Sequence, residues 1–165
     1  AFLFCCYAGM RYSDFTNLSK KNIVDINQET WLIYKSVKTG TEVRLPLYLL
    51  FAGKGIVILN KYRNNLEDFF RLRDNSNINK DLIIIAKLAG LSKKISFHTA
   101  RHTNATLLIY NGVNITTVQK LLGHKSVKTT QVYTNIMDMT IVHDLEKIKQ
   151  AALGIKKKTD NSFNK

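Results

Sequence analysis

Four residues between positions 98 and 133 have the types and spacing expected of a site that binds an oxyanion beside a nucleophile. His98 and Arg101 lie three residues apart, so a helix would present both side chains on one face. His124 follows a Leu-Leu-Gly run, and Tyr133 lies nine residues further on. Guanidinium and imidazole groups donate hydrogen bonds to anionic oxygens, and a phenol can form a covalent intermediate. The pattern therefore indicates an anion site beside a reactive tyrosine, without yet naming a reaction.

Together with two further cations, these residues supply what cleavage of a DNA phosphodiester without a metal requires. The transition state spreads negative charge over the non-bridging oxygens, and the planar fork of arginine matches that geometry. A nucleophile must attack, and a proton must reach the departing 5′ oxygen. The sequence has no DxD, DDE or HExxH pattern, so we expect neither metal nor cofactor. The candidates are Arg11 and Arg101 as clamps, His98 and His124 as hydrogen-bond partners, Lys38 as the acid and Tyr133 as the nucleophile.

The charge of the chain favours a polyanionic partner. Lys and Arg number 25 against 12 Asp and Glu, which gives a formal net charge of +13. Nucleic acid is the commonest partner of such a basic protein, while generic basicity and affinity for a membrane surface are the alternatives. A chain of 165 residues with 45% hydrophobic content is long enough for one domain with a proper core.

Cysteine usage and apolar runs point to a reducing cytoplasm. The two cysteines, Cys5 and Cys6, are adjacent in an apolar helical run and do not readily bridge. No apolar run approaches transmembrane length, and the first ten residues lack the basic region and cleavage site of a signal peptide. The chain starts without Met inside a helix-like run, so we expect it to be a domain of a larger protein.

The first half of the chain predicts two helices followed by a small sheet. Residues 1–8 are nearly all apolar and predict a buried helix ended by Gly9, and a second short helix is expected to start at Ser13. Alternating residues over 22–38, with a turn at 27–29, indicate two antiparallel strands. A tight turn at 38–40 leads to a third strand over 42–46.

The second half predicts helices throughout. Helical patterns cover 48–62 and 76–89, whereas 66–73 is ambiguous. Asn114 is expected to cap a helix that Gly123 ends, and Ser126 to cap a short helix that carries Tyr133. Asp138 is expected to cap a last helix, and residues 154–165 read as a basic, disordered tail. The apolar side of that last helix consists of Ile141, Leu145, Ile148 and Ala152.

In order and spacing, these motifs resemble the tyrosine recombinase (phage integrase) family, and most of all the integrases of bacterial mobile elements. The resemblance covers the chain from Gly9 to about Leu153. It implies a catalytic domain over residues 1–153 that is mainly α with a small antiparallel β-sheet, and a site-specific recombinase that works through a 3′-phosphotyrosine. The motifs that carry it are Arg11 in AGMRYSDF, Lys38 in VKTGTEVRLP, His98 and Arg101 in HTARHT, and His124 and Tyr133 in LLGHKSVKTTQVYT.

The resemblance also assigns roles to the candidate residues. It implies that Arg11 and Arg101 bind the scissile phosphate, with His124 contacting one of its oxygens. His98 is similar to the histidine that binds the phosphate or accepts the tyrosine proton, and Lys38 to the hairpin lysine that protonates the 5′ oxygen. Tyr133 resembles the nucleophile. Asp14 matches an acidic position, commonly Glu in the family, whose carboxylate would support Arg11. His102 directly follows Arg101 and is interpreted as structural, and His143 as a surface residue.

Partners and alternatives follow from the same resemblance. Family members carry a core-binding domain before the catalytic one, which we expect to lie outside this sequence. The expected partners are double-stranded DNA and further protomers, with no membrane and no small-molecule substrate. We expect a monomer when the protein is free and a tetramer on DNA. The expected location is the bacterial cytoplasm, at the nucleoid. A type IB topoisomerase-like enzyme is one alternative, but LLGH in place of a long insertion before the tyrosine disfavours it. A non-catalytic DNA-binding accessory domain is the other.

Overall fold

The chain folds as a mainly helical domain with one small sheet, as the sequence predicted. The computed structural model describes residues 1–133, 145–146 and 148–149, so the predicted cap at Asp138, most of the last helix, His143 and the tail lie outside the described residues. Within 1–133 the elements, in chain order, are α1 (Phe2–Ala8), α2 (Tyr12–Thr16), η1 (Lys20–Asn22), β1 (Ile23–Ile26), β2 (Glu29–Lys35), β3 (Glu42–Pro46), η2 (Leu50–Gly53), α3 (Lys54–Lys61), α4 (Leu66–Phe70), α5 (Asn75–Leu88), α6 (Phe97–Tyr110), α7 (Ile115–Leu122) and α8 (Lys128–Gln131).

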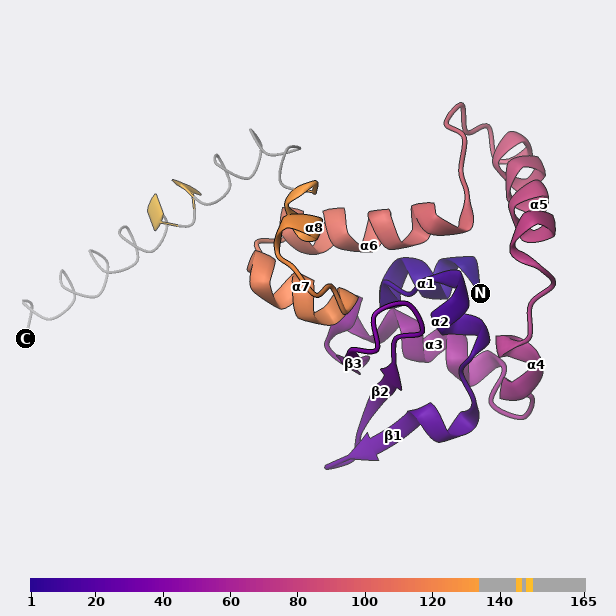
Figure 1. Cartoon of the computed structure of the whole chain (residues 1–165), viewed down its shortest axis with the longest axis horizontal. Coiled ribbons are helices and arrows are strands. Elements are labelled where there is room, and N and C mark those ends of the chain that lie inside the picture. The colour runs from indigo at the N-terminus through magenta and orange to yellow at the C-terminus, as the bar shows by residue number, and fades with distance from the viewer. Residues whose placement is uncertain (134–144, 147, 150–165) are drawn as a thin grey trace, which may run out of the picture.

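Helix α1 lies at the centre of the domain, between α6 and α3 (Figure 1). Its apolar sequence explains that position, because Phe4, Cys5 and Ala8 are all buried. The helix ends at Gly9, as predicted, with a φ of 68°. A Cβ on Gly9 would lie 2.6 Å from Asn104 Oδ1, so only glycine lets α6 approach this closely. The end of α1 is thereby fixed against the helix that carries His98 and Arg101.

Aromatic packing fixes α2 in the core. The ring of Phe15 contacts the rings of Phe4, Phe69, Phe70 and Phe97, with centroid separations between 5.5 and 6.2 Å. Such pairs contribute about 0.5–1.5 kcal/mol each beyond the area they bury. Because Phe15 is the hub of this cluster, its neighbours on α2 have little freedom to move.

The three strands form an antiparallel sheet in the order β1-β2-β3, as predicted. Asn27 and Gln28 connect β1 to β2 in a two-residue turn, both with positive φ, as a tight hairpin turn requires. Leu32 on β2 pairs with Leu45 on β3, and both are completely buried. Strand β3 packs against α7, so the loop between β2 and β3 is carried toward the end of that helix (Figure 1).

Several predicted boundaries shift. Helix α2 begins at Tyr12 with Arg11 as its N-cap residue, one residue earlier than the expected start at Ser13. The ambiguous segment 66–73 contains α4, and α5 begins after Asp74, which accepts a hydrogen bond from the backbone of Asn77. The short helix α8 has Val127 rather than Ser126 at its N-cap. It does not carry Tyr133, which lies two residues beyond its end.

Helices α6 and α7 have strong termini of their own. A capping box of Ser96 and Thr99 opens α6, with each side chain bonded to the backbone of the other residue. Asn114 caps α7, as predicted, by accepting from the backbone of Thr116 at 2.9 Å. Gly123 ends α7 in the left-handed conformation, also as predicted, and turns the chain toward His124.

Candidate active site

The side chain of Arg101 joins two chain segments that are far apart in the sequence. It projects from α6 and is only 1% exposed. Its Nη1 donates to the carbonyl oxygen of Gly9 at 2.7 Å, and its Nη2 donates to that of Leu122 at 2.5 Å. Gly9 lies two residues before Arg11, and Leu122 lies two residues before His124. The guanidinium therefore lies between the segment that carries Arg11 and the turn that carries His124.

Arg101 keeps its positive charge despite its burial. Burial lowers the pKa of Arg101 to about 10, and the nearby charge of Arg11 acts in the same direction. The side chain is still protonated at neutral pH. A guanidinium has five N–H donors, and the two carbonyls occupy two of them. The remaining donors can bind an anion.

Arg11 is oriented by a buried carboxylate. Its Nη1 lies 3.4 Å from Asp14 Oδ2 and 3.2 Å from the hydroxyl of Ser36, to which it donates. Asp14 is 2% exposed and also accepts hydrogen bonds from the Ser36 hydroxyl at 3.2 Å and the Val37 amide at 2.8 Å. One carboxylate therefore fixes both Arg11 and the start of the loop after β2.

The loop after β2 places Lys38 at its exposed tip. On one side of Lys38, the Val37 amide is bonded to Asp14. On the other side, the Thr39 hydroxyl donates to the carbonyl oxygen of Gly123 at 3.2 Å. The loop is thus attached to α2 and to the end of α7. The lysine itself remains exposed between these two attachments, on a stem long enough to reorient.

His124 is buried and uncharged at neutral pH. Its ring Nδ1 lies 2.9 Å from the hydroxyl of Thr130, and the residue is 8% exposed. Burial lowers the pKa of His124 to about 4, helped by the positive charges of Arg101, Arg11 and His98. The Thr130 contact fixes the orientation of the ring. A neutral imidazole oriented in this way can donate one hydrogen bond to a phosphate oxygen.

His98 lies at the rim of the site near the start of α6. Together with Arg11 and Lys38 it lines a cavity of about 310 Å³. Burial of part of the ring lowers the pKa of His98, and the charges of His102, Arg101, Arg11 and Lys38 lower it further. Arg11, Lys38 and His98 are thus brought to one cavity, with Arg101 and His124 close enough to interact electrostatically.

Tyr133 follows α8 and is 6% exposed. Its amide donates to the carbonyl oxygen of Thr130 at 3.1 Å, which links it to the residue that orients His124. Burial raises the pKa of the Tyr133 phenol, while the charges of Arg101 and Arg11 act in the opposite direction. The phenol therefore lies within electrostatic reach of both arginines, although it is protonated at neutral pH.

His102, interpreted from the sequence as structural, contacts two of the candidate residues. His102 follows His98 by four residues, so on a helix the two side chains share a face. Their rings are perpendicular, with centroids 4.5 Å apart. On its other side, the ring of His102 contacts that of Tyr133 with a centroid separation of 5.3 Å. The spacing from His98 was the signal that should have placed it at the site.

Three hydroxyl residues around the site had no recognisable signal of their own. Ser36 contacts Arg11 and Asp14, Thr39 contacts the end of α7, and Thr130 contacts His124. Each is close in sequence to a candidate residue. Serine and threonine are so common in loops, however, that only the folded arrangement distinguishes these three.

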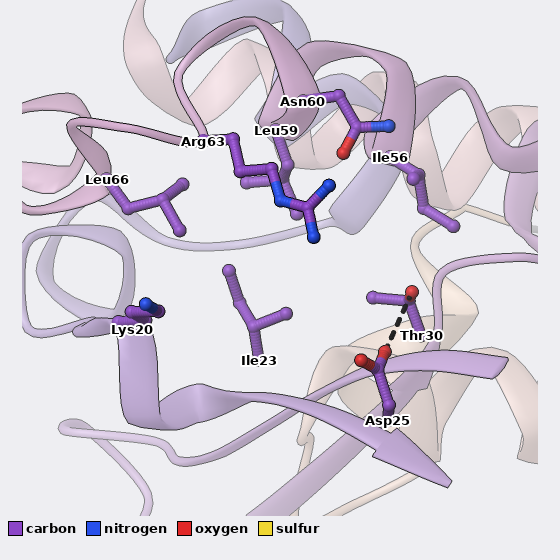
Figure 2. Close-up of a pocket in the computed structure, with 9 residues that line it drawn as sticks. All are labelled: Lys20, Ile23, Asp25, Thr30, Ile56, Leu59, Asn60, Arg63 and Leu66. Atoms are coloured by element: carbon purple, nitrogen blue, oxygen red, sulfur yellow. Dashed lines mark hydrogen bonds between the residues drawn. The ribbon is translucent and has the colours of Figure 1, made fainter. Parts of the chain in front are cut away.

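A larger pocket lies away from these residues (Figure 2). It has a volume of about 390 Å³ and lies between β1 and α3, with the guanidinium of Arg63 pointing into it. None of the candidate residues lines it. Within the described part of the chain, no three His, Cys, Asp or Glu side chains are grouped so that they could hold a metal ion. No helix in that same part is long and apolar enough to cross a membrane.

Comparison with known proteins identifies the family. The model of the phage integrase family matches residues 1–139, which is most of the chain. The chain belongs to the phage integrase family. Membership agrees with the resemblance drawn from the motifs and with the observed fold.

Individual relatives within the phage integrase family support this assignment. The chain is 44% identical to a tyrosine recombinase of Pseudothermotoga lettingae over 149 residues, which cover 87% of this chain and 51% of the relative. It is 30% identical to the tyrosine recombinase XerC of Rickettsia prowazekii, over 91% of this chain and 49% of the relative. The crystal structure of XerA recombinase superposes with a TM-score of 0.68 at 27% sequence identity. The superposition covers 86% of this chain and 54% of the XerA chain. The chain thus spans about half the length of the curated relatives it matches.

Proposed function

We propose that this chain is the catalytic domain of a tyrosine-type site-specific DNA recombinase. The observation that carries the proposal is the position of Arg101, whose guanidinium is bonded to Gly9 and Leu122 and so brings Arg11 and His124 to the same place. A buried arginine, a partly buried one and a neutral histidine are suited to a phosphodiester anion, which has two non-bridging oxygens to be bound.

In the proposed site, Arg11 and Arg101 bind the non-bridging oxygens of the scissile phosphate. His124 donates a hydrogen bond to one of them, and Thr130 keeps its ring in place. Asp14 keeps Arg11 in position rather than touching DNA, because it is buried beneath the guanidinium. These groups are fixed before DNA arrives, so little reorganisation opposes the growth of negative charge in the transition state.

The proposed reaction exchanges one phosphodiester for another. The oxygen of Tyr133 attacks the phosphorus, the bond to the 5′ oxygen breaks, and a 3′-phosphotyrosine forms. The phenol proton passes to His98 or to water, while Lys38 gives a proton to the departing 5′ oxygen. The reverse steps with a different 5′ hydroxyl rejoin the DNA. Because the bond energy is conserved in the phosphotyrosine, no external energy source is consumed.

The proposed partners are double-stranded DNA and further protomers. The net charge of +13 favours binding to the DNA backbone and predicts a strong dependence on salt. Two structures with the same fold support this choice, XerH recombinase bound to a difH substrate and a lambda integrase dimer bound to a core site. We propose a tetramer on DNA and a monomer when free, acting at the nucleoid in the bacterial cytoplasm.

Covalent trapping tests the proposal. Sequencing the DNA junctions that the full-length protein makes in cells identifies its site, which is then built into a duplex with a nick beside the scissile phosphate. After cleavage, the short fragment that bears the free 5′ hydroxyl diffuses away. Rejoining is then impossible, so the protein stays attached to the 3′ phosphate of the DNA. We expect an adduct that resists denaturant, forms in EDTA and is absent in Tyr133→Phe.

Two outcomes would contradict the proposal. No adduct from the full-length protein on its own junction sequence would favour the accessory DNA-binding domain. Relaxation of a supercoiled plasmid that lacks the site would favour a topoisomerase. Tyr110→Phe is the matched control, because it removes an exposed phenol elsewhere on the domain and should leave adduct formation unchanged.

A further inference from the structure

The imidazole of His102 lies between two residues of the proposed site. Its ring is perpendicular to that of His98 at a centroid distance of 4.5 Å, and it is inclined by 63° to the ring of Tyr133 at 5.3 Å. His98 and His102 both come from α6, whereas Tyr133 follows α8. The three rings therefore connect the rigid helix that carries Arg101 to the segment that carries the nucleophile.

Tyr133 is buried and belongs to the hydrophobic core of the domain, although it follows α8 rather than lying on it. It lies beyond the last residue of α8, a helix of only four residues. Besides this packing, its amide donates to Thr130 and its ring contacts the ring of His102. The backbone bond fixes the main chain but not the plane of the phenol, and the contact with His102 adds a directional ring contact to the packing that orients that plane.

We propose that His102 is a positioning residue that holds the ring of Tyr133 in the orientation for attack. The inference rests on the proposed recombinase function. His102 acts through the flat faces and edges of its ring, which pack against Tyr133 on one side and His98 on the other. The proposed action of His102 is on the nucleophile, because its ring contacts Tyr133, whereas Lys38, the proposed acid, is carried by the loop after β2.

Two suicide duplexes that differ in one atom separate these two sides of the reaction. One has the natural bridging 5′ oxygen at the scissile phosphate, and the other has sulfur there. A thiolate leaves without being protonated, since a thiol is far more acidic than an alcohol. Sulfur therefore compensates for a missing acid, as in Lys38→Ala, but not for a badly oriented nucleophile.

The variants are His102→Ala, His102→Phe and His102→Gln in the full-length protein, with Leu107→Ala as an exposed control on the same helix. Losing one aromatic contact should slow single-turnover adduct formation by roughly three- to tenfold. We expect His102→Ala to show this loss on both duplexes with unchanged DNA affinity. His102→Phe should restore the rate, because it keeps a flat ring. His102→Gln should not, because it has no ring. Thermal unfolding shows whether each variant is folded.

Each alternative outcome overturns the inference in a recognisable way. If sulfur restores His102→Ala as it restores Lys38→Ala, then His102 acts on the leaving group. If Gln restores the rate and Phe does not, hydrogen bonding is required and packing is not. If all His102 variants match Leu107→Ala, the ring has no role. In these three cases the wild-type protein still forms its covalent adduct, so the proposed function stands. If the wild-type protein forms no adduct on either duplex, the proposed function is wrong, and so is the inference that rests on it.

Discussion

Replacing His124 by glutamine should change how the stability of the domain depends on pH. The ring is 8% exposed, lies 2.9 Å from the hydroxyl of Thr130 and has its pKa lowered to about 4, mainly by burial. In the unfolded chain the same ring titrates near the ordinary value of 6.5. The unfolded state therefore binds a proton at a pH where the folded state does not.

The sign and size of the effect follow from this difference. The contribution of His124 is fully present above pH 6.5 and is lost as the pH falls toward 4, because protonation stabilises the unfolded state. The difference between the pKa values of His124 in the folded and unfolded states corresponds to at most roughly 3 kcal/mol in the free energy of unfolding. About 2 kcal/mol of this contribution is lost by pH 5. For a domain of this size, that loss lowers the melting temperature by about 4–8 °C.

Thermal unfolding followed by circular dichroism between pH 4.5 and 7.5 measures the effect. The wild type should lose about 2 kcal/mol more than His124→Gln on going from pH 7.5 to 5. His98 is present in both proteins, so its own titration largely cancels in the difference. His102→Gln is the matched control, since it removes an exposed imidazole from the same region. Parallel curves for wild type and His124→Gln would show that the buried ring is not held uncharged, and the reasoning would be refuted.

Two further predictions concern the turn at the end of α7 and the loop that it contacts. Gly123→Ala should cost about 2–4 kcal/mol in urea unfolding, because its φ is positive and the new Cβ would lie 2.6 Å from Val43 Cγ2. Gly90→Ala has a similar φ in open space and should cost only about 1–2 kcal/mol; equal losses would contradict the steric argument. Thr39→Val removes the bond to the Gly123 carbonyl and should slow adduct formation on the oxygen-bridged duplex more than on the sulfur-bridged one, since it disturbs Lys38. Equal slowing on both duplexes would show that the bond serves some other group.

Local sequence patterns were sufficient to predict most of the fold. The helix before Gly9, the three strands and the helix between Asn114 and Gly123 depend on burial patterns, caps and turn residues that lie close together in sequence. The start of α2 was misplaced because its N-cap residue, Arg11, makes no side-chain cap bond. A segment that is fixed by tertiary packing gives a weaker signal than one fixed by its own caps.

Contacts around the site were harder to predict than the site residues themselves. The motif spacing indicated which residues to group, whereas the carboxylate of Asp14 reaching the Val37 amide depends on how α2 meets the sheet. The same holds for Thr39 and the end of α7. The ring contacts of His102 were not predicted for a different reason: the interpretation considered its adjacency to Arg101 and overlooked the four-residue spacing from His98.

The burial of Arg101 has a physical explanation that also accounts for the geometry of the site. Gly9 caps the C-terminus of α1, and Leu122 is the last residue of α7, so both carbonyls that accept from Arg101 lie at the negative ends of helix dipoles. Such an end stabilises a partly buried cation by up to about 2 kcal/mol. Two ends together still fall short of the several kcal/mol that burying an ion costs, and the neighbouring charge of Arg11 adds repulsion. The carboxylate of Asp14 offsets part of this positive charge, and in the proposed function the scissile phosphate bound between the two arginines offsets more of it.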